Sequence, residues 1–126
     1  IETNGTLMPS NVLDPFISHY NISFKLSNSG MTESSRIVED VIGLLSCKDN
    51  VIYKFVVSNK SDVVEVFETY VNKYNFEYKN VFLMPGVTSR DALSKLEPVI
   101  IELCKQYCVN YSTRLHIHVW DQLTGV

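Results

Sequence analysis

The sequence predicts an α/β fold built on a parallel β-sheet, organised as part of an enzyme barrel. Segments with strand-like patterns alternate with segments of helical periodicity, and this order favours parallel pairing through right-handed crossovers. Residues 51–57 form an almost continuous apolar run, which is typical of a parallel strand covered on both faces. Residues 79–88 and 113–120 have the pattern of the last two strands of such a barrel.

Five strands are expected along the chain. The first occupies residues 1–6 and stops at the turn signal Asn4-Gly5, and the second is the alternating segment 21–26. The other three are expected at 51–57, 80–84 and 114–120. Because the chain opens inside the first strand and without a methionine, we expect it to be the C-terminal half of a larger protein.

Three helices are expected between the later strands. In the first, apolar residues recur over 37–45 at helical spacing, and the second begins at Ser61. The third opens with a capping-box pattern at 88–91 and runs to about Cys108. Pro98 lies inside this third helix, so we expect a kink there or a split into two helices.

Composition narrows the class of protein. A chain of 126 residues with 45% hydrophobic and 20% charged residues is expected to form one domain, residues 1–126. The net charge of -3 argues against a nucleic-acid partner, and no apolar run approaches the length of a membrane span. The three cysteines are an odd count without a secretory signal, which favours reduced thiols and a cytoplasmic location.

Ligands of parallel α/β folds bind beyond the carboxyl ends of the strands, so the residues that follow each strand are candidates for a binding site. Lys25 lies near one such end in an apolar setting, where its ammonium group needs an anionic partner. A structural salt bridge is the favoured interpretation of Lys25, and a ligand carboxylate is the alternative. For Lys54, which is flanked by aromatic residues, the structural interpretation is stronger.

Two histidines are expected on one face of the last strand, because His116 and His118 are separated by one residue. This spacing suits two metal ligands, but no third ligand lies at a suitable distance, so a metal site is not expected. For His116 two interpretations stay open: a hydrogen-bonding contact to a ligand, or a satisfied core histidine.

Cys104 and Cys108 are four residues apart and share a helix face. Without a third cysteine at the required place, we expect buried thiols packed against the sheet. Ligation of an iron–sulfur cluster by this chain alone is therefore not expected. The sequence also contains no Gly-rich phosphate loop and no basic aromatic patch.

Five blocks of sequence are informative in combination. They are Glu2-Thr-Asn-Gly-Thr, Ser23-Phe-Lys-Leu-Ser-Asn-Ser-Gly, Tyr53-Lys-Phe-Val-Val, Val81-Phe-Leu-Met-Pro, and Thr113-Arg-Leu-His-Ile with Trp120 and Gly125-Val126. In this order the chain resembles, along its whole length, the C-terminal portion of the 7-carboxy-7-deazaguanine synthases. These are radical S-adenosylmethionine (SAM) enzymes.

The resemblance implies an α/β fold of a particular kind: the C-terminal half of a partial, incomplete TIM-like radical SAM barrel. The complete enzyme would hold SAM, a [4Fe-4S] cluster and Mg²⁺. It would act as a lyase of 7-deazapurine (queuosine-type) biosynthesis, which rearranges 6-carboxy-5,6,7,8-tetrahydropterin to 7-carboxy-7-deazaguanine with loss of ammonia. A homodimer is also implied.

The resemblance further implies which residues contact the ligands. The residues that match SAM-contacting segments are Ser23, Phe24, Lys25, Met84, Pro85, Gly86 and Val87. The residues that match positions near the pterin substrate are Glu2, Asn4, His116 and Val126. Under this interpretation, the catalytic residues and metal ligands lie outside the chain, in the missing N-terminal half of the barrel.

The chain departs from the family pattern at several positions. Phe24 stands where the family commonly has proline, and Gly86-Val87 replace a more usual acidic residue and glycine, which favours backbone contacts there. The CxxxCxxC loop, the Gly-rich SAM strand and the Mg²⁺ site are absent from the sequence, so this chain alone should not catalyse the reaction. The alternatives are a non-catalytic α/β ligand-binding module and another radical SAM enzyme with the same half-barrel.

Overall fold

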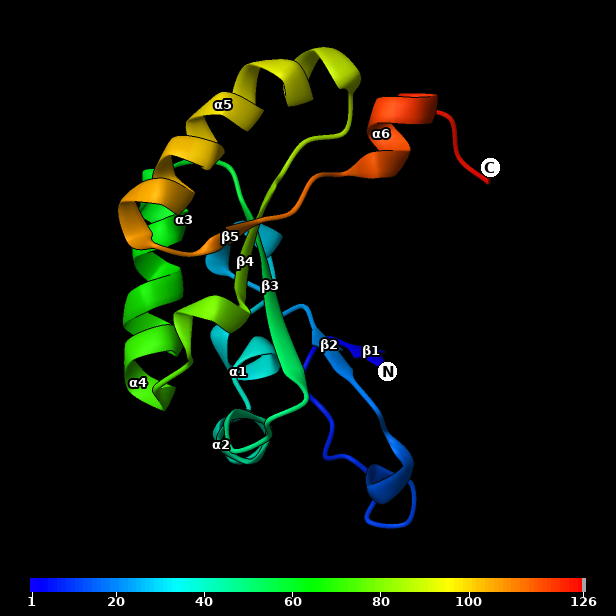
Figure 1. Cartoon of the computed structure of the whole chain (residues 1–126), viewed down its shortest axis with the longest axis vertical. Helices are drawn as coiled ribbons and strands as arrows, with labels where there is room; N and C mark the ends of the chain where they lie inside the picture. The colour runs from blue at the N-terminus through cyan, green and yellow to red at the C-terminus, as the bar shows by residue number, and fades with distance from the viewer. Residues whose placement is uncertain (126) are drawn as a thin grey trace.

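The computed structural model describes residues 1–125 and shows an α/β fold built on one five-stranded parallel sheet (Figure 1). The strands are β1 (Glu2–Thr3), β2 (Tyr20–Ile22), β3 (Val51–Val57), β4 (Val81–Pro85) and β5 (Asn110–Tyr111). Their spatial order is β1-β2-β3-β4-β5, and every neighbouring pair is parallel. The predicted parallel α/β fold is therefore confirmed, and the sheet runs in sequence order without a reversal.

Helices connect the strands. They are η1 (Asp14–Phe16), η2 (Ser27–Ser29), α1 (Glu33–Arg36), α2 (Glu39–Ser46), α3 (Lys60–Glu65), the π-helical η3 (Val66–Val71), α4 (Asn72–Tyr74), η4 (Tyr78–Asn80), α5 (Arg90–Tyr107) and α6 (Leu115–Trp120). In Figure 1, α3, α4 and α5 lie to the left of β3 and β4, whereas α6 lies to the right. None of the helices within residues 1–125 combines the length and the apolar character needed to span a membrane.

Only one face of the sheet is buried. Along β3, residues Val51, Tyr53, Phe55 and Val57 are buried, whereas the alternate residues are half-buried, and β4 repeats this pattern. The prediction that this strand is covered on both faces is thus wrong for the described residues, because the helices that connect β3, β4 and β5 cover a single side (Figure 1). We call the half-buried side the open face. Helices on one side and strands in sequence order are the arrangement of a barrel segment rather than of a doubly wound sheet.

Aromatic rings fill the buried side near the end of β2. Phe24 stacks on Tyr70 with ring centroids 5.0 Å apart, and Tyr53 stacks on Phe76 at 3.7 Å. All four side chains are at most 4% exposed. Burial of each large ring contributes roughly 2–3 kcal/mol, so this cluster fixes where the β2 segment lies against the helix that follows β3.

The last predicted strand is wrong. Residues 115–120 form α6, and the sheet position beside β4 is occupied by β5, whose Asn110 and Tyr111 pair with Phe82 and Leu83. The alternation that suggested a strand puts aliphatic side chains at every second position, but only Ile117 of this segment is buried. Once β5 has filled the sheet edge, the chain passes beyond the carboxyl end of β4 and winds into a short helix.

One helix expectation also needs correction, and for another helix the structure decides between the two alternatives. The first predicted helix is broken, because Ile37 and Val38 are extended and α2 begins only at Glu39. The third helix is a single α5 of 18 residues that Pro98 does not split, and Figure 1 shows it changing direction along its length. Because proline has no N–H, the Ser94 carbonyl lacks its helical hydrogen bond. Ser94 and Pro98 are both exposed, so water can donate a hydrogen bond to that carbonyl.

A substitution at Gly5 tests the packing of this residue against the Phe24 ring. It has a φ of 74°, and a Cβ there would collide with the Phe24 ring. We expect Gly5→Ala to lower the free energy of unfolding by about 1–3 kcal/mol in urea titrations. Gly43→Ala is the control: Gly43 lies inside α2 with open space around it, so alanine should stabilise by about 0.5–1 kcal/mol. Equal effects of the two substitutions would contradict the packing described for Gly5.

Candidate functional site

The carboxyl ends of β2, β3 and β4 surround a pocket of about 380 Å³, which we call the strand-end pocket. It is lined by Phe24, Lys25, Leu26, Asn28, Ser29, Val56, Ser58, Gly86, Val87, Thr88 and Arg114. These residues come from segments more than 80 positions apart in sequence, and the parallel sheet brings them together because all its strands end on the same side.

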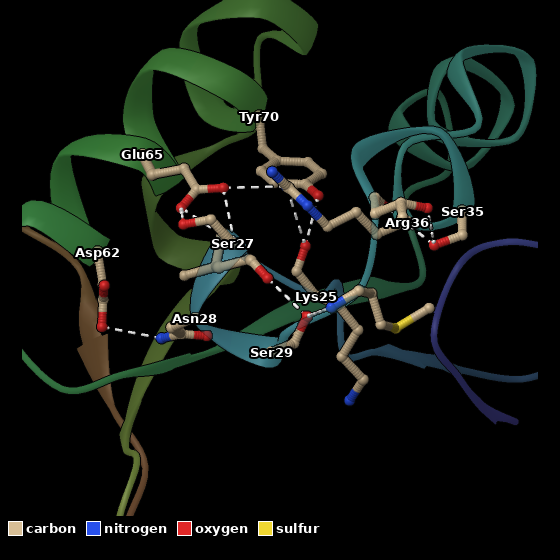
Figure 2. A network of polar contacts seen from close by, with 12 residues as sticks. Lys25, Ser27, Asn28, Ser29, Ser35, Arg36, Asp62, Glu65 and Tyr70 are labelled. Atoms are coloured by element: carbon tan, nitrogen blue, oxygen red, sulfur yellow. Dashed lines mark hydrogen bonds and ion pairs between the residues drawn. The ribbon is translucent and has the colours of Figure 1, made fainter.

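The charge of the strand-end pocket is positive. Lys25 and Arg114 contribute two cations, and no carboxylate belongs to its lining. Within residues 1–125, no acidic side chain forms an ion pair with the Lys25 ammonium, so the favoured interpretation of Lys25 as a structural salt bridge is wrong. Figure 2 shows the Lys25 side chain pointing away from Glu65 and Asp62. The pocket is therefore suited to an anionic ligand group.

A carboxylate from α3 holds the segment that follows β2. Glu65 accepts hydrogen bonds from the Ser27 backbone N–H, at 3.0 Å, and from the Ser27 hydroxyl, at 2.5 Å. It also pairs with the Arg36 guanidinium at 2.9 Å, and Arg36 is 6% exposed (Figure 2). The buried Arg36 charge and the Ser27 amide thus depend on a single carboxylate.

A second carboxylate joins the ends of β2 and β3. Asp62, 7% exposed, accepts hydrogen bonds from the Ser58 backbone N–H at 2.7 Å and from the Asn28 amide at 2.8 Å. The Asn59 side chain caps α3 by accepting the Asp62 backbone N–H at 3.0 Å. Two lining residues of the strand-end pocket, Asn28 and Ser58, are therefore tied to the same buried acid.

The π-helical turn η3 directs Tyr70 towards β2. Its hydroxyl donates to the Lys25 carbonyl at 2.9 Å, and burial raises the pKa of Tyr70 above its usual value. The Arg36 guanidinium donates to the same carbonyl at 3.4 Å. π-Helical turns are rare and are often found at functional sites. Here the turn fixes the backbone of Lys25 while leaving its ammonium group free.

Gly86 forms the floor of the strand-end pocket at the end of β4. Its N–H donates to the Val57 carbonyl at 2.9 Å. A Cβ at this position would lie 2.5 Å from the Ser58 hydroxyl oxygen and 3.2 Å from a methyl carbon of Val56. Glycine therefore keeps backbone exposed where a larger residue would fill the pocket, and a ligand can approach the main chain there.

A second pocket of about 300 Å³ adjoins the first, and we call it the C-terminal pocket. It is lined by Thr88, Arg114, His116, Ile117, Asp121, Gln122, Leu123 and Thr124. Thr88 and Arg114 line both pockets, so the two form neighbouring parts of one site. His116 is exposed on α6, which excludes the interpretation of a core histidine. His118 does not share the helix face of His116, because residues two positions apart in a helix point in directions that differ by about 200°.

Glu97 of α5 holds the segment that leads into α6. Its carboxylate accepts hydrogen bonds from the Tyr111 hydroxyl at 2.5 Å and the Thr113 hydroxyl at 3.3 Å, and it lies 3.4 Å from the His118 ring. The Tyr111 hydrogen bond is the main reason why the pKa of Glu97 lies below its usual value. Burial is the main reason why the pKa of Tyr111 rises to about 12.

A third pocket, of about 190 Å³, lies beneath the N-terminal loop and is lined mostly by aliphatic side chains. The carboxylate in its lining, Asp14, is already bound by Lys48 at 2.7 Å and by Tyr20. The strand-end pocket, by contrast, offers cations without carboxylate partners. This difference makes the strand-end pocket the candidate site.

The residues predicted to contact SAM fall into three groups. Lys25, Gly86 and Val87 line the strand-end pocket through side chain or backbone. Ser23 and Met84 are half-buried and lie on the open face next to it. Phe24 and Pro85 are buried, and the Phe24 ring belongs to the aromatic core, so only the backbone of these two positions can face a ligand.

The residues predicted near the pterin are less closely grouped. His116 lines the C-terminal pocket. Glu2 pairs with Asn21 at the far end of the sheet, and Asn4 accepts hydrogen bonds from the Thr6 N–H and hydroxyl. Neither lines the two pockets. Val126 lies outside the described residues.

Asn28, Ser58 and Thr88 belong to the site as well, and they lie in the strand-end segments 23–30, 54–59 and 84–88 that the sequence predicts as candidates, whereas Arg114 was not predicted. Asn28 and Arg114 lie inside motif blocks, so the blocks themselves carried that signal. Ser58 follows β3 directly, as the rule that ligands bind at strand ends predicts. Arg114 was missed because the sequence places it at the amino end of the last predicted strand, opposite the end where ligands bind.

The described residues do not fit an iron–sulfur cluster or a Mg²⁺ ion. Within residues 1–125, no three His, Cys, Asp or Glu side chains gather at a distance suited to a metal. Cys104 is buried, and its burial raises the pKa of the thiol to about 11, whereas Cys108 is exposed in a left-handed conformation just after α5. The expectation of two buried thiols is thus correct for Cys104 and wrong for Cys108.

The Glu65 interactions can be tested by truncation. We expect Glu65→Ala to lower the free energy of unfolding by about 2–4 kcal/mol, because it leaves the Arg36 charge and the Ser27 amide unpaired. Amide hydrogen exchange at Ser27 should also become faster. Glu39→Ala is the matched control, since its pair with Lys73 is exposed and should contribute little. An equally small effect at both sites would refute the role given to Glu65.

Glu97 should make the stability depend on pH. Since its folded pKa lies below the ordinary value of 4.5, the stability that it contributes is complete above that pH and is lost as the pH falls through the folded pKa. The free energy of unfolding in urea would be measured at pH 7 and at roughly pH 3. The loss of this free energy between the two pH values should be smaller for Glu97→Gln than for the unchanged chain. Glu102→Gln, in an exposed pair with Lys105, should leave the difference unchanged.

Comparison with known proteins bears on the predicted resemblance. No family model matches the chain, and no solved structure matches it. A curated relative, the 7-carboxy-7-deazaguanine synthase of Pyrobaculum aerophilum, is 31% identical over 125 residues, which cover 99% of this chain and 53% of the relative. The chain thus spans about half the length of that protein. The similarity to a C-terminal portion of 7-carboxy-7-deazaguanine synthase, predicted from the sequence motifs, is confirmed along nearly the whole chain.

Proposed function

We propose that this chain is the SAM- and substrate-binding part of a radical SAM lyase that converts 6-carboxy-5,6,7,8-tetrahydropterin to 7-carboxy-7-deazaguanine. The similarity to 7-carboxy-7-deazaguanine synthase supports this proposal. The parallel sheet in sequence order, with the helices that connect its later strands on one side (Figure 1), is what a segment of a partial barrel requires. The rest of the barrel would close over the open face.

One observation carries the proposal furthest. Three motif blocks that lie far apart in sequence meet around the two adjoining pockets: Ser23–Gly30, Tyr53–Val57 through Val56, and Thr113–Ile117, together with Gly86, which follows the block Val81–Pro85. A conventional surface cleft would not require these particular blocks to meet. Their convergence at the carboxyl ends of parallel strands is where α/β barrels bind their ligands.

The strand-end pocket is the proposed SAM site. The Gly86 backbone, kept open by the missing Cβ, and the Val87 backbone would lie along the ligand. The Lys25 ammonium would pair with the carboxylate of its methionyl part. SAM bound to a [4Fe-4S] cluster supplies the radical chemistry in such enzymes, and both the cluster ligands and Mg²⁺ would come from outside this chain.

The C-terminal pocket is the proposed pterin site. His116 would hydrogen-bond the substrate there, and the shared lining residue Thr88 would place the pterin next to SAM. Glu2 and Asn4 would reach the substrate from the first strand once the barrel is complete. A homodimer is part of the same proposal.

The full-length protein tests the proposal. Expressed anaerobically with iron and sulfide, it should turn over 6-carboxytetrahydropterin in the presence of SAM and Mg²⁺. We expect His116→Ala to lower kcat/KM by roughly 10²-fold, because a hydrogen bond to the reacting ligand is lost. His19→Ala is the matched control, since His19 is exposed and belongs to neither pocket. A cluster-loaded protein without turnover would overturn the proposal and favour a binding module or another radical SAM reaction.

A further inference from the structure

We propose that Arg114 binds a ligand carboxylate at the junction of the strand-end and C-terminal pockets. This inference rests on the proposed function and adds a residue that the sequence motifs did not assign. Its first support is an unpaired donor: Arg114 Nε is buried and has no hydrogen-bond partner within residues 1–125. A buried donor without an acceptor is costly, so a ligand acceptor that reached Arg114 Nε would relieve that cost.

The second support is how the side chain is held. Arg114 Nη1 donates to the Val87 carbonyl at 2.9 Å, which orients the plane of the guanidinium. The Arg114 backbone is fixed as well, because its carbonyl accepts the Ile117 and His118 amides at the start of α6. With Nη1 occupied, the edge formed by Nε and Nη2 is the one that remains for a planar anion. This edge matches the two oxygens of a carboxylate.

The third support is the charge around Arg114. The strand-end pocket brings Lys25 as a second cation and no carboxylate. The C-terminal pocket contains one acid, Asp121, whose carboxylate already accepts the Arg90 backbone N–H at 2.6 Å. Glu97 is likewise engaged, by Tyr111 and Thr113. Within residues 1–125, the acids near Arg114 are therefore engaged by other groups and leave the guanidinium available for a ligand carboxylate.

Two ligands of the proposed reaction carry a carboxylate: SAM, on its methionyl part, and the carboxypterin, on its ring. Arg114 lines both pockets, so the chemistry of recognition is the same for either source. Binding measurements can separate the two. The full-length, cluster-loaded protein would be titrated with SAM, with decarboxylated SAM, with 6-carboxypterin and with pterin, and binding followed by equilibrium dialysis.

We expect Arg114→Gln to weaken binding of one carboxylate ligand by roughly tenfold or more, while its analogue without the carboxylate binds as before. Arg114→Lys, which keeps the charge but not the two-point geometry, should restore only part of the loss. Arg90→Gln is the control, because Arg90 is an exposed arginine that also donates to a backbone carbonyl, that of Val119 at 3.1 Å. Circular dichroism spectra of the variants would show that they are folded.

Loss of SAM binding alone would assign Arg114 to the methionyl carboxylate, and loss of 6-carboxypterin binding alone would assign it to the substrate. Unchanged affinity for both ligands would overturn this inference and leave the proposed function intact. An equal loss for a ligand and its decarboxylated analogue would also overturn it, because the effect would not involve the carboxylate. If the unchanged protein bound neither ligand, both the inference and the proposed function would be refuted.

Discussion

Alternation along β2, β3 and β4 sends every second side chain under the helices and leaves the others on the open face. Because the strands are parallel and in register, residues with the same direction line up across the sheet, as Val56 and Met84 do. Phe24 can therefore anchor the aromatic core while its neighbours Ser23 and Lys25 face outwards. The positions of the candidate ligand contacts just after β2, Ser23 to Lys25, follow from this one packing requirement.

Buried charge completes the positioning of the β2 end. A buried ion pair such as Arg36–Glu65 contributes little net stability relative to an apolar pair, because both charges must lose their water. Its value here is geometric. The carboxylate also holds the Ser27 amide, and the guanidinium also reaches the Lys25 carbonyl. Lys25 and Ser27 are thus held in place by side chains of α1 and α3, which follow them in the chain.

The parallel sheet and most of its strands could be predicted from the sequence, because runs such as 51–57 and 81–84 carry both apolar character and the right length. The last strand could not. Aliphatic residues at 115, 117 and 119 satisfy the period of a strand, but local pattern does not reveal that Asn110 and Tyr111 already occupy the sheet edge. The same mistake concealed Arg114, since the amino end of a predicted parallel strand lies opposite the edge of the sheet where ligands bind. Orphaned donors such as its Nε are visible only in three dimensions.

The π-helical turn at Val66–Val71 has a consequence for how this part of the chain can change during evolution. A π-turn contains one residue more than an α-helical turn would need. Deleting a residue there would restore regular helical geometry, yet it would rotate Tyr70 by about 100° relative to Glu65, since each helical residue turns by that angle. Both side chains now reach the same short stretch, Lys25 to Ser27. Homologues that keep this site should therefore tolerate substitutions on the outer surface of the helix but conserve its length between these two residues.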